Sequence, residues 1–334
     1  MNVLVTGGTG YVGSHTVVEL QQKGYEVFII DNLSNSQAVV VDAIEKITGI
    51  KPHFSKVDLC NAAALKDFFV RNKIDSIIHF AAFKAVGESV QQPLRYYYNN
   101  ITSLINLCKC AEEFSVKDFI FSSSCSVYGE PDYVPVDEKH PIKDAQSPYG
   151  ASKQMSERIL SDIAVAGMMQ TISLRYFNPS GAHPSVLIGE LPVNEPSNLV
   201  PVITRTAAGK QKEMVVFGND YDTPDGTCIR DYIHVKDIAI AHIYALERLK
   251  NKKNKAGFEV FNLGTGKGYS VLEVINCFEK VTGKKLNYRI GAKRPGDVSK
   301  VFSDCKLSNS VLGWKAELPL EQMLLSAWEW QQKI

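Results

Sequence analysis

A glycine-rich turn near the amino terminus constrains the fold more than any other feature of this sequence. The segment "NVLVTGGTGYVG" places Gly7, Gly10 and Gly13 directly after a short apolar run and at the start of a helix-length segment. Glycines at this spacing allow a tight turn and a close approach of phosphate groups to the first amides of the helix. Asp31 follows Gly13 by 18 residues, at the end of the second apolar run. Together these features predict a strand–turn–helix–strand unit that binds a dinucleotide.

The carboxylate at position 31 predicts which dinucleotide is bound. It can accept hydrogen bonds from ribose hydroxyls and its charge repels a 2′-phosphate, so it favours NAD over NADP. Turn glycines followed by a helix-capping aspartate would look the same without any ligand, but their position between a strand and a helix favours the NAD site. Asp58 ends the third apolar run and either reaches the adenine edge or only caps a turn, and Lys84 either contacts a phosphate or lies on the surface.

Apolar runs alternate with amphipathic helix-length segments through the first half of the chain. The predicted strands cover 2–7, 26–31, 52–58, 76–82, 118–124 and 171–178, and the predicted helices cover 11–23, 38–48, 63–72 and 94–114. Runs that are apolar throughout are typical of parallel strands buried on both faces. The pattern predicts an α/β fold with a doubly wound parallel sheet of the Rossmann type.

The pattern changes beyond residue 178. Segment 178–198 is rich in Pro, Gly and Asn and is predicted to be a loop, and shorter strands and helices follow as far as residue 334. Segment 258–266 reads as one more strand returning to the large sheet. We therefore expect a smaller C-terminal α/β substrate-binding domain interleaved with the first. The predicted NAD-binding domain is 1–177 with about 230–266, and the predicted substrate domain is 178–229 with 267–334.

Composition excludes several classes of function. Lys and Arg number 37 and Asp and Glu 36, a net charge of +1, which argues against a general nucleic-acid or membrane-surface binder. No apolar run approaches the roughly 18 residues of a membrane span, and the first residues lack the features of an export signal. The seven cysteines are odd in number and lack metal-site spacing. We expect a cytoplasmic protein without a metal site and without a nucleic-acid or membrane partner.

A tyrosine and a lysine lie four residues apart in "SPYGASK", where a helix is predicted to begin. Tyr149 and Lys153 therefore share one helical face. The run "FSSSCSVYG" ends the fifth predicted strand and brings Ser124 to the edge at which a dinucleotide binds. Alone, these groups would more simply be a solvated pair and polar turn serines.

A phenol with an ordinary pKa of about 10 is a poor base at neutral pH. A nearby ammonium, together with a positive nicotinamide ring, favours the phenolate. We predict that Tyr149 is the general base and acid for a substrate hydroxyl, that Lys153 is its electrostatic partner, and that Ser124 aligns the same hydroxyl.

The glycine turn, Asp31, Ser124, Tyr149 and Lys153 together resemble the extended short-chain dehydrogenase/reductase superfamily. Within it, longer blocks are similar to the UDP-glucose (UDP-galactose) 4-epimerase family almost from end to end. These blocks are "DNLSNS", "FAAFKAVGESV", "FSSSCSVYG", "SPYGASK", "LRYFNPSGAHPS", "FGNDYDTPDGTCIRDYIHV" and "NLGTGKGYSV". The resemblance implies an isomerase that inverts C4 of a UDP-hexose through a transient 4-keto sugar, with tightly bound NAD taking up the hydride and returning it.

The resemblance also implies which residues form the site. The implied catalytic residues are Ser124, Tyr149 and Lys153. The implied NAD-binding residues are Gly7, Gly10, Tyr11, Val12, Gly13, Asp31, Asn32, Asn35, Ser36, Asp58, Leu59, Phe80, Ala81, Ala82, Lys84, Asn99, Ser124, Tyr149, Lys153 and Phe177. The implied UDP-hexose-binding residues are Lys84, Ser124, Tyr149, Asn178, Asn198, Leu199, Val215, Phe217, Arg230, Arg294, Asp297 and Val301. Without the family, Arg230 beside Asp231 would more simply form an internal ion pair, and Phe177 and Phe217 would be core residues.

Two positions depart from the pattern of the family. Cys125 stands where alanine is common, and it is either a small buried thiol or a redox-sensitive one. Val301 stands where some members have a tyrosine against the hexose, so more room is expected and UDP-GlcNAc and UDP-GalNAc are predicted to fit as well. The loop "HPSVLIGELPVNEPSNL" lacks some acidic and glycine positions common in the family, which leaves its sugar contacts open.

Two other functions stay open at this point. A nucleotide-sugar 4,6-dehydratase or decarboxylase uses the same oxidation but typically has Thr-Asp-Glu where this chain has Ser124, Cys125 and Ser126. A catalytically inactive NAD-sensing protein would be expected to have lost the tyrosine or the lysine. The helices at 94–114 and near Tyr149 resemble those that form a four-helix dimer interface in the superfamily, so a homodimer is predicted.

Overall fold

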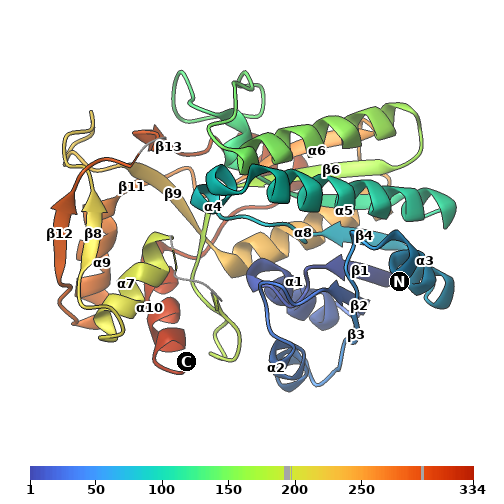
Figure 1. The fold of residues 1–334 in the computed structure, drawn as a ribbon, viewed down its shortest axis with the longest axis horizontal. Helices are drawn as coiled ribbons and strands as arrows, with labels where there is room; N and C mark the ends of the chain where they lie inside the picture. The colour runs from blue at the N-terminus through green and yellow to red at the C-terminus, as the bar shows by residue number, and fades with distance from the viewer. Residues whose placement is uncertain (192–195, 197, 295–296) are drawn as a thin grey trace.

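A seven-stranded parallel sheet forms the centre of the computed structural model, which describes residues 1–191, 196, 198–294 and 297–334 (Figure 1). The strand order is β10-β6-β5-β4-β1-β2-β3. The strands are β1 (Asn2–Thr6), β2 (Glu26–Asp31), β3 (His53–Lys56), β4 (Ser76–His79), β5 (Asp118–Ser124), β6 (Gln170–Tyr176) and β10 (Phe258–Leu263). The chain winds outward from β1 to β3 and then from β4 to β6 on the other side. The predicted doubly wound Rossmann-type fold is confirmed.

Helices cover both faces of this sheet. The helices on one face are α1 (Tyr11–Gln22), α2 (Val39–Thr48) and α8 (Val235–Lys250), and those on the other are α3 (Ala62–Arg71), α5 (Pro93–Glu113) and α6 (Pro148–Val165). Because successive strand residues point to opposite faces, Val3 and Val5 pack in the core with α1 and α8, whereas Leu4 packs with α3 and α5. A strand buried on both faces needs the continuous apolar run seen in the sequence.

Several elements end earlier than the apolar pattern predicts. β4 stops at His79, so Phe80 to Ala82 leave the sheet, and the run 171–178 divides into β6 and the short β7 (Asn178–Ser180). α4 (Val86–Gln91) and the single turn η1 (Cys125–Tyr128) follow the ends of β4 and β5. Backbone that leaves the carboxyl end of a parallel strand is where ligands bind in such sheets.

A smaller unit lies beside the large sheet, at the left of Figure 1. In it, β9 (Ile229–His234) pairs with β7, β11 (Gly268–Ser270) and β13 (Lys300–Val301), and β8 (Met214–Phe217) pairs with β12 (Tyr288–Gly291). Its helical elements are α7 (Leu199–Ala207), α9 (Val271–Thr282), the π-helical turn η2 (Ser308–Leu312) and α10 (Leu320–Gln331). Phe278 and Trp328 meet edge to face in the core of this unit, 5.9 Å between ring centroids.

The chain passes between the two units more than once. β10 pairs with β6, so segment 258–263 does return to the large sheet. β9, however, belongs to the smaller sheet, because its partners are β7, β11 and β13, and the chain rejoins the large unit only at α8. Of the predicted loop 178–198, residues 181–191, 196 and 198 lie in no helix or strand, and residues 192–195 and 197 lie outside the described residues.

Candidate active site

The glycine-rich turn between β1 and α1 forms one wall of the candidate site. Gly7 has a φ of +71°, and a Cβ built on it would lie 2.8 Å from the Ala81 amide nitrogen. A Cβ on Gly13 would lie 2.2 Å from the Gly7 carbonyl oxygen. Gly10 is the N-cap of α1, and no side chain caps the helix. The amides of its first turn are therefore directed at a ligand, and the turn fits the diphosphate of a dinucleotide.

Asp31 joins the end of β2 to this turn. Its carboxylate accepts hydrogen bonds from the Thr9 amide at 3.3 Å and from the Ser36 hydroxyl at 3.1 Å. Asp58, after β3, accepts a hydrogen bond from the Cys60 amide at 2.8 Å, which is the turn-capping role that the sequence left open. Both aspartates also line the cavity described next. They are placed where the ribose and adenine of NAD are predicted to bind.

A cavity of about 730 Å³ runs along the carboxyl ends of the central strands. All the residues predicted to bind NAD line it: Gly7, Gly10, Tyr11, Val12, Gly13, Asp31, Asn32, Asn35, Ser36, Asp58, Leu59, Phe80, Ala81, Ala82, Lys84, Asn99, Ser124, Tyr149, Lys153 and Phe177. Asn178 and Asn198, predicted to bind the sugar nucleotide, line it as well. Residues spread from position 7 to position 198 thus converge on a single cavity.

The first turn of α6 brings the predicted catalytic tyrosine to this cavity. The Ser147 side chain caps the helix by accepting a hydrogen bond from the Gly150 amide at 3.1 Å, and Pro148 occupies the first helical turn. Tyr149 hydrogen-bonds with the side chain of Ser124 at the end of β5. Lys153, one turn further along, donates a hydrogen bond from Nζ to the Ser122 carbonyl oxygen at 2.6 Å.

Burial dominates the electrostatics of the catalytic side chains. It raises the pKa of Tyr149 well above its ordinary value, and the hydrogen bond with Ser124 opposes this only in part. It lowers the pKa of Lys153 to about 8, against the raising effect of the nearby Glu157 charge. The Lys153 Nζ lies 6.0 Å from the centroid of the Tyr149 ring. Desolvation is thus the largest influence on the phenol pKa within the protein, and the favouring of the phenolate by Lys153 together with the nicotinamide ring stays a prediction for the NAD-bound state.

The remaining residues predicted to bind the UDP-hexose lie elsewhere, and four of them, Phe217, Arg230, Arg294 and Asp297, form a cluster. They do not line the 730 Å³ cavity: Leu199, Val215, Phe217, Arg230, Arg294, Asp297 and Val301. Asp297 lies 3.0 Å from Arg294 Nε and 3.9 Å from Arg230 Nη2, and the Arg294 guanidinium lies 4.6 Å from the centre of the Phe217 ring. The charge of Arg230 also acts on the pKa of the Cys125 thiol. Because Cys125 lines the cavity, the cluster adjoins the cavity at this residue.

Three of the predicted substrate residues meet in the small sheet. Asn178 on β7 is paired with Tyr232 on β9, and Val301 on β13 is paired with Arg230 on β9. Arg230 therefore pairs with Asp297 rather than forming the internal ion pair with Asp231 that its sequence neighbour suggests. Asp231 instead accepts hydrogen bonds from Thr265, Gly266 and Ser303 and ties β9 to the following loops.

Val301 is buried, whereas Cys125 is half-buried and lines the cavity. Val301 packs in a cluster with Val127, Tyr128, Val136 and Phe177, of which Phe177 lines the cavity. Desolvation raises the pKa of Cys125 to about 11. A thiol with a raised pKa is a weak nucleophile, which favours an unreactive thiol at this position over a redox-sensitive one.

Lys84 is engaged by a residue that the sequence did not single out. Its Nζ donates to a Glu190 carboxylate oxygen at 3.1 Å, and the Asn198 side-chain amide donates to the same oxygen at 3.1 Å. The Trp330 indole holds the Glu190 carbonyl at 2.9 Å. Lys84 is therefore neither a free surface lysine nor an unpaired phosphate ligand, and Glu190 shares the cavity wall with it.

Sequence reasoning also missed Tyr176, whose hydroxyl lies 2.7 Å from the Ser122 hydroxyl in the cavity wall. Its position before Phe177 at the end of a predicted strand could have indicated it, because strand ends meet at this edge. Trp330 and Ile334 also line the cavity. No local pattern indicates them, since they reach the site only through the packing of α10. Over 1–191, 196, 198–294 and 297–334, no His, Cys, Asp and Glu side chains gather in a group of three or more that could hold a metal.

This chain matches a known protein family over most of its length. Residues 3–264 match the model of the NAD dependent epimerase/dehydratase family. The chain belongs to this family. Among its curated relatives is a UDP-glucose 4-epimerase of Bacillus subtilis (strain 168), 48% identical over 332 residues that cover 99% of this chain and 97% of that protein.

Solved structures of related epimerases have the same fold over the whole chain. The UDP-glucose 4-epimerase of Stenotrophomonas maltophila, with bound NAD and formylated UDP-arabinopyranose, has a TM-score of 0.96 and 46% identity. That of Bifidobacterium longum, in complex with NAD+ and UDP, has a TM-score of 0.95 and 46% identity. Each comparison covers 100% of this chain and 98% of the other. As a member of the NAD-dependent epimerase/dehydratase family, this chain takes NAD as its cofactor.

Proposed function

We propose that this chain is a UDP-glucose 4-epimerase, which inverts C4 of a UDP-hexose reversibly through a transient 4-keto sugar. The observation that carries this proposal is the convergence of Ser124, Tyr149 and Lys153 on the cavity formed by the glycine-rich turn. Two curated relatives that share nearly half of their residues with this chain are UDP-glucose 4-epimerases, which supports the proposal further.

In this proposal Tyr149 removes the proton of the 4-hydroxyl group and later returns it. Ser124 hydrogen-bonds with the phenol in the protein and aligns the substrate hydroxyl beside it. Lys153 contributes a positive charge to the same wall of the cavity. NAD, when bound, supplies a hydride acceptor and a positive ring close to the phenol. The buried setting excludes water, which protects the keto sugar and strengthens each of these interactions.

We propose that the nucleotide part of the substrate binds to the cluster of Phe217, Arg230, Arg294 and Asp297. Guanidinium groups bind phosphate oxygens well, so Arg230 and Arg294 are suited to the diphosphate. Asp297 is suited to the ribose hydroxyls, and the Phe217 ring, which is partly exposed, to the face of uracil. Asn178 and Asn198 would then hydrogen-bond the diphosphate and the sugar from the cavity wall.

The test is to incubate purified protein with UDP-galactose, without added NAD, and to identify the products by NMR. We expect UDP-glucose, an isomer of equal mass. A 4,6-dehydratase would give a keto sugar of lower mass, whereas a decarboxylase, whose substrate needs a C6 carboxylate, or an inactive NAD-sensing protein would give no product. Either result would refute the proposed function.

We also propose that N-acetylated UDP-hexoses are substrates, because a valine at 301 occupies much less volume than the tyrosine found in some family members. Adding UDP-GalNAc to the same assay tests this point separately. Conversion to UDP-GlcNAc is expected, and a rate no higher than background would refute it without touching the main proposal.

A homodimer formed through α5 and α6 is proposed as the assembled state. The supporting observation is that apolar side chains on these helices are exposed, with Leu94 82% and Tyr98 64% accessible and Met155 and Ile105 also exposed. Exposed apolar patches of this kind mark interaction sites. Sedimentation should give a dimer at micromolar concentration, and Leu94→Glu with Tyr98→Glu should give a monomer. A wild-type monomer would contradict the proposal.

We propose a cytoplasmic location and the domain division given by the sequence, 1–177 with about 230–266 and 178–229 with 267–334, in which residues 230–234 still pair within the smaller sheet as part of β9. No helix among the described residues is long and apolar enough to cross a membrane. Every cysteine of the chain is unpaired in the structure, as expected in a reducing compartment. Cell fractionation tests the location, and limited proteolysis at the proposed boundaries tests the domains.

A further inference from the structure

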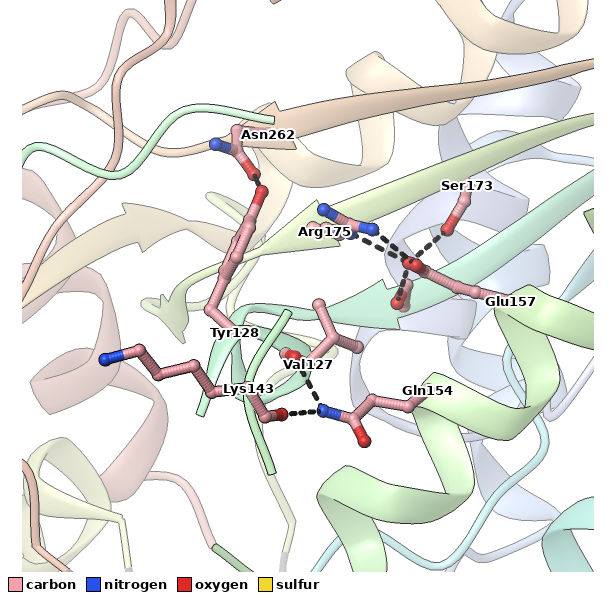
Figure 2. A network of polar contacts seen from close by, with 9 residues as sticks. Val127, Tyr128, Lys143, Gln154, Glu157, Ser173, Arg175 and Asn262 are labelled. Atoms are coloured by element: carbon pink, nitrogen blue, oxygen red, sulfur yellow. Dashed lines mark hydrogen bonds and ion pairs between the residues drawn. The ribbon is translucent and has the colours of Figure 1, made fainter. Parts of the chain in front are cut away.

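A buried ion pair between Glu157 and Arg175 joins α6 to β6 (Figure 2). Glu157 on α6 accepts two hydrogen bonds from the Arg175 guanidinium on β6, at 3.0 and 2.6 Å, and both side chains are 5% exposed. Glu157 also accepts hydrogen bonds from the Ser123 hydroxyl at 2.6 Å and the Ser173 hydroxyl at 2.8 Å. The Glu157 carboxylate thereby joins one helix to two central strands.

The contacts between α6 and β5 follow the helical repeat. Tyr149, Lys153 and Glu157 are spaced by four residues and share one face of α6. On β5 they meet the side chain of Ser124, the carbonyl oxygen of Ser122 and the side chain of Ser123, respectively. Three neighbouring serines of β5 thus contact three successive turns of the helix, although not in chain order. Glu157 completes a line of contacts whose other two members are the proposed catalytic groups.

Glu157 also dominates the charge around Lys153. The titratable and charged groups around the lysine and its neighbouring phenol come from five elements. They are Tyr149 and Glu157 from α6, His79 from β4, Tyr176 and Arg175 from β6, Cys125 from η1 and Tyr96 from α5. β5 contributes the uncharged Phe121 ring, 4.7 Å from Nζ. Burial keeps His79 neutral by lowering its pKa to about 3. The Glu157 carboxylate is the group that opposes the effect of burial on Lys153.

We propose that Glu157 is a positioning residue for the reaction: held by Arg175, it fixes the strand end that carries Ser124 against the helix that carries Tyr149 and Lys153, and it places a negative charge one turn from the lysine. This inference rests on the proposed function and deepens it. Glu157 does not line the cavity, so its effect on catalysis passes through the three residues that do.

The experiment compares Glu157→Gln with two controls in the same assay of UDP-galactose conversion. Glu259→Gln removes the carboxylate of a second buried pair, in which Glu259 accepts from Arg248 at 2.6 and 3.0 Å between β10 and α8, away from the catalytic residues. Gln154→Ala removes hydrogen bonds that join α6 to the Val127 and Lys143 carbonyl oxygens (Figure 2). Each variant is measured for kcat against pH, KM, retained NAD and unfolding by urea.

Glu157→Gln is expected to lower kcat roughly 10- to 100-fold with little change in KM or retained NAD, because a displaced strand end misplaces the reacting groups. The alkaline limb of kcat should move to lower pH by about one unit, because Lys153 loses the nearby negative charge that holds its proton. Glu157→Asp, which keeps the charge, should return the alkaline limb to its wild-type pH but should not restore the full kcat. Both controls should unfold more easily and keep the wild-type kcat and limb.

Wild-type kcat and an unmoved alkaline limb in Glu157→Gln would overturn the inference, as would the same shift in Glu259→Gln or Gln154→Ala. If Glu157→Gln does not fold, Glu157→Gln with Arg175→Met replaces it, because removing both charges leaves no unpaired charge in the core. Wild-type kcat and an unmoved alkaline limb in this double variant would likewise overturn the inference. A wild-type protein that makes no isomer would refute the proposed function instead, so the two failures are distinct.

Discussion

Gly13→Ala tests the link between the glycine-rich turn and cofactor binding. The added Cβ would lie 2.2 Å from the Gly7 carbonyl oxygen, and ordinary contacts begin at 3.4 Å, so α1 would have to move by about 1.2 Å. Forcing an extra methyl group into a packed site costs about 1–3 kcal/mol, and the better helix propensity of alanine returns at most about 1 kcal/mol. We expect a lower free energy of unfolding, by about 1–2 kcal/mol.

The substitution should reduce the affinity for NAD more than it reduces the free energy of unfolding. Displacing the first turn of α1 weakens at least one hydrogen bond from an amide to a charged phosphate, worth about 1.5–3 kcal/mol, which corresponds to a roughly 10- to 100-fold loss of affinity. Retained NAD per chain and the affinity of stripped protein for NAD are the measurements.

Gly87→Ala is the matched control, because a Cβ on Gly87 in α4 would meet nothing within 4 Å. It should bind NAD normally and be as stable as wild type or slightly more so. Normal NAD affinity in Gly13→Ala would refute the reasoning.

Two further predictions follow from the buried groups. Val301→Tyr should lower turnover of UDP-GalNAc at least about tenfold more than that of UDP-galactose, because the ring cannot fit in the cluster with Phe177 and must project toward the sugar; equal losses would contradict this. Burial lowers the pKa of His15 and His79 to about 3, so the unfolded chain binds protons below pH 6.5 that the folded protein does not. Urea unfolding should show stability falling between pH 6.5 and 4, by about 1.4 kcal/mol per pH unit for each such histidine, offset in part by Asp237, whose pKa burial raises to about 6. Equal stability at pH 7 and pH 5 would be incompatible with neutral buried histidines.

The cofactor side of the molecule could be predicted from the sequence because its elements are local. Each strand is an apolar run, and most side chains predicted to contact NAD lie within a few residues of a strand end, whereas Asn99, Tyr149 and Lys153 lie on helices α5 and α6. Once the alternation of strands and helices is recognised, parallel strands bring those ends to one edge. The predicted strand at 26–31 matches β2 residue for residue, and all the predicted NAD-binding residues line one cavity.

The substrate side depends on packing that no local pattern reveals. Arg230 is brought to Asp297 and Val301 by the pairing of β9 with β13, two strands far apart in the sequence. Glu190 meets Lys84 across an irregular loop, and Trp330 arrives with the C-terminal helix. The spacing of Tyr149, Lys153 and Glu157 was available in the sequence, but the partner of Glu157, Arg175, becomes visible only when β6 lies beside β5.

The electrostatics of the phenol also required the structure. A sequence shows that a lysine stands one turn from Tyr149, but it does not show how deeply both are buried. Burial moves the two pKa values in opposite directions, up for the phenol and down for Lys153. The charge that favours the phenolate must therefore outweigh a desolvation cost that the sequence argument did not include.

Tyr149→Phe tests the central claim most directly, since it removes one hydroxyl group and keeps the ring that fills the cavity wall. With UDP-galactose as substrate, kcat should fall by roughly 10²- to 10⁴-fold, the contribution of a positioned general acid and base, while the protein still retains NAD. Undiminished turnover by the NAD-loaded variant would contradict the account.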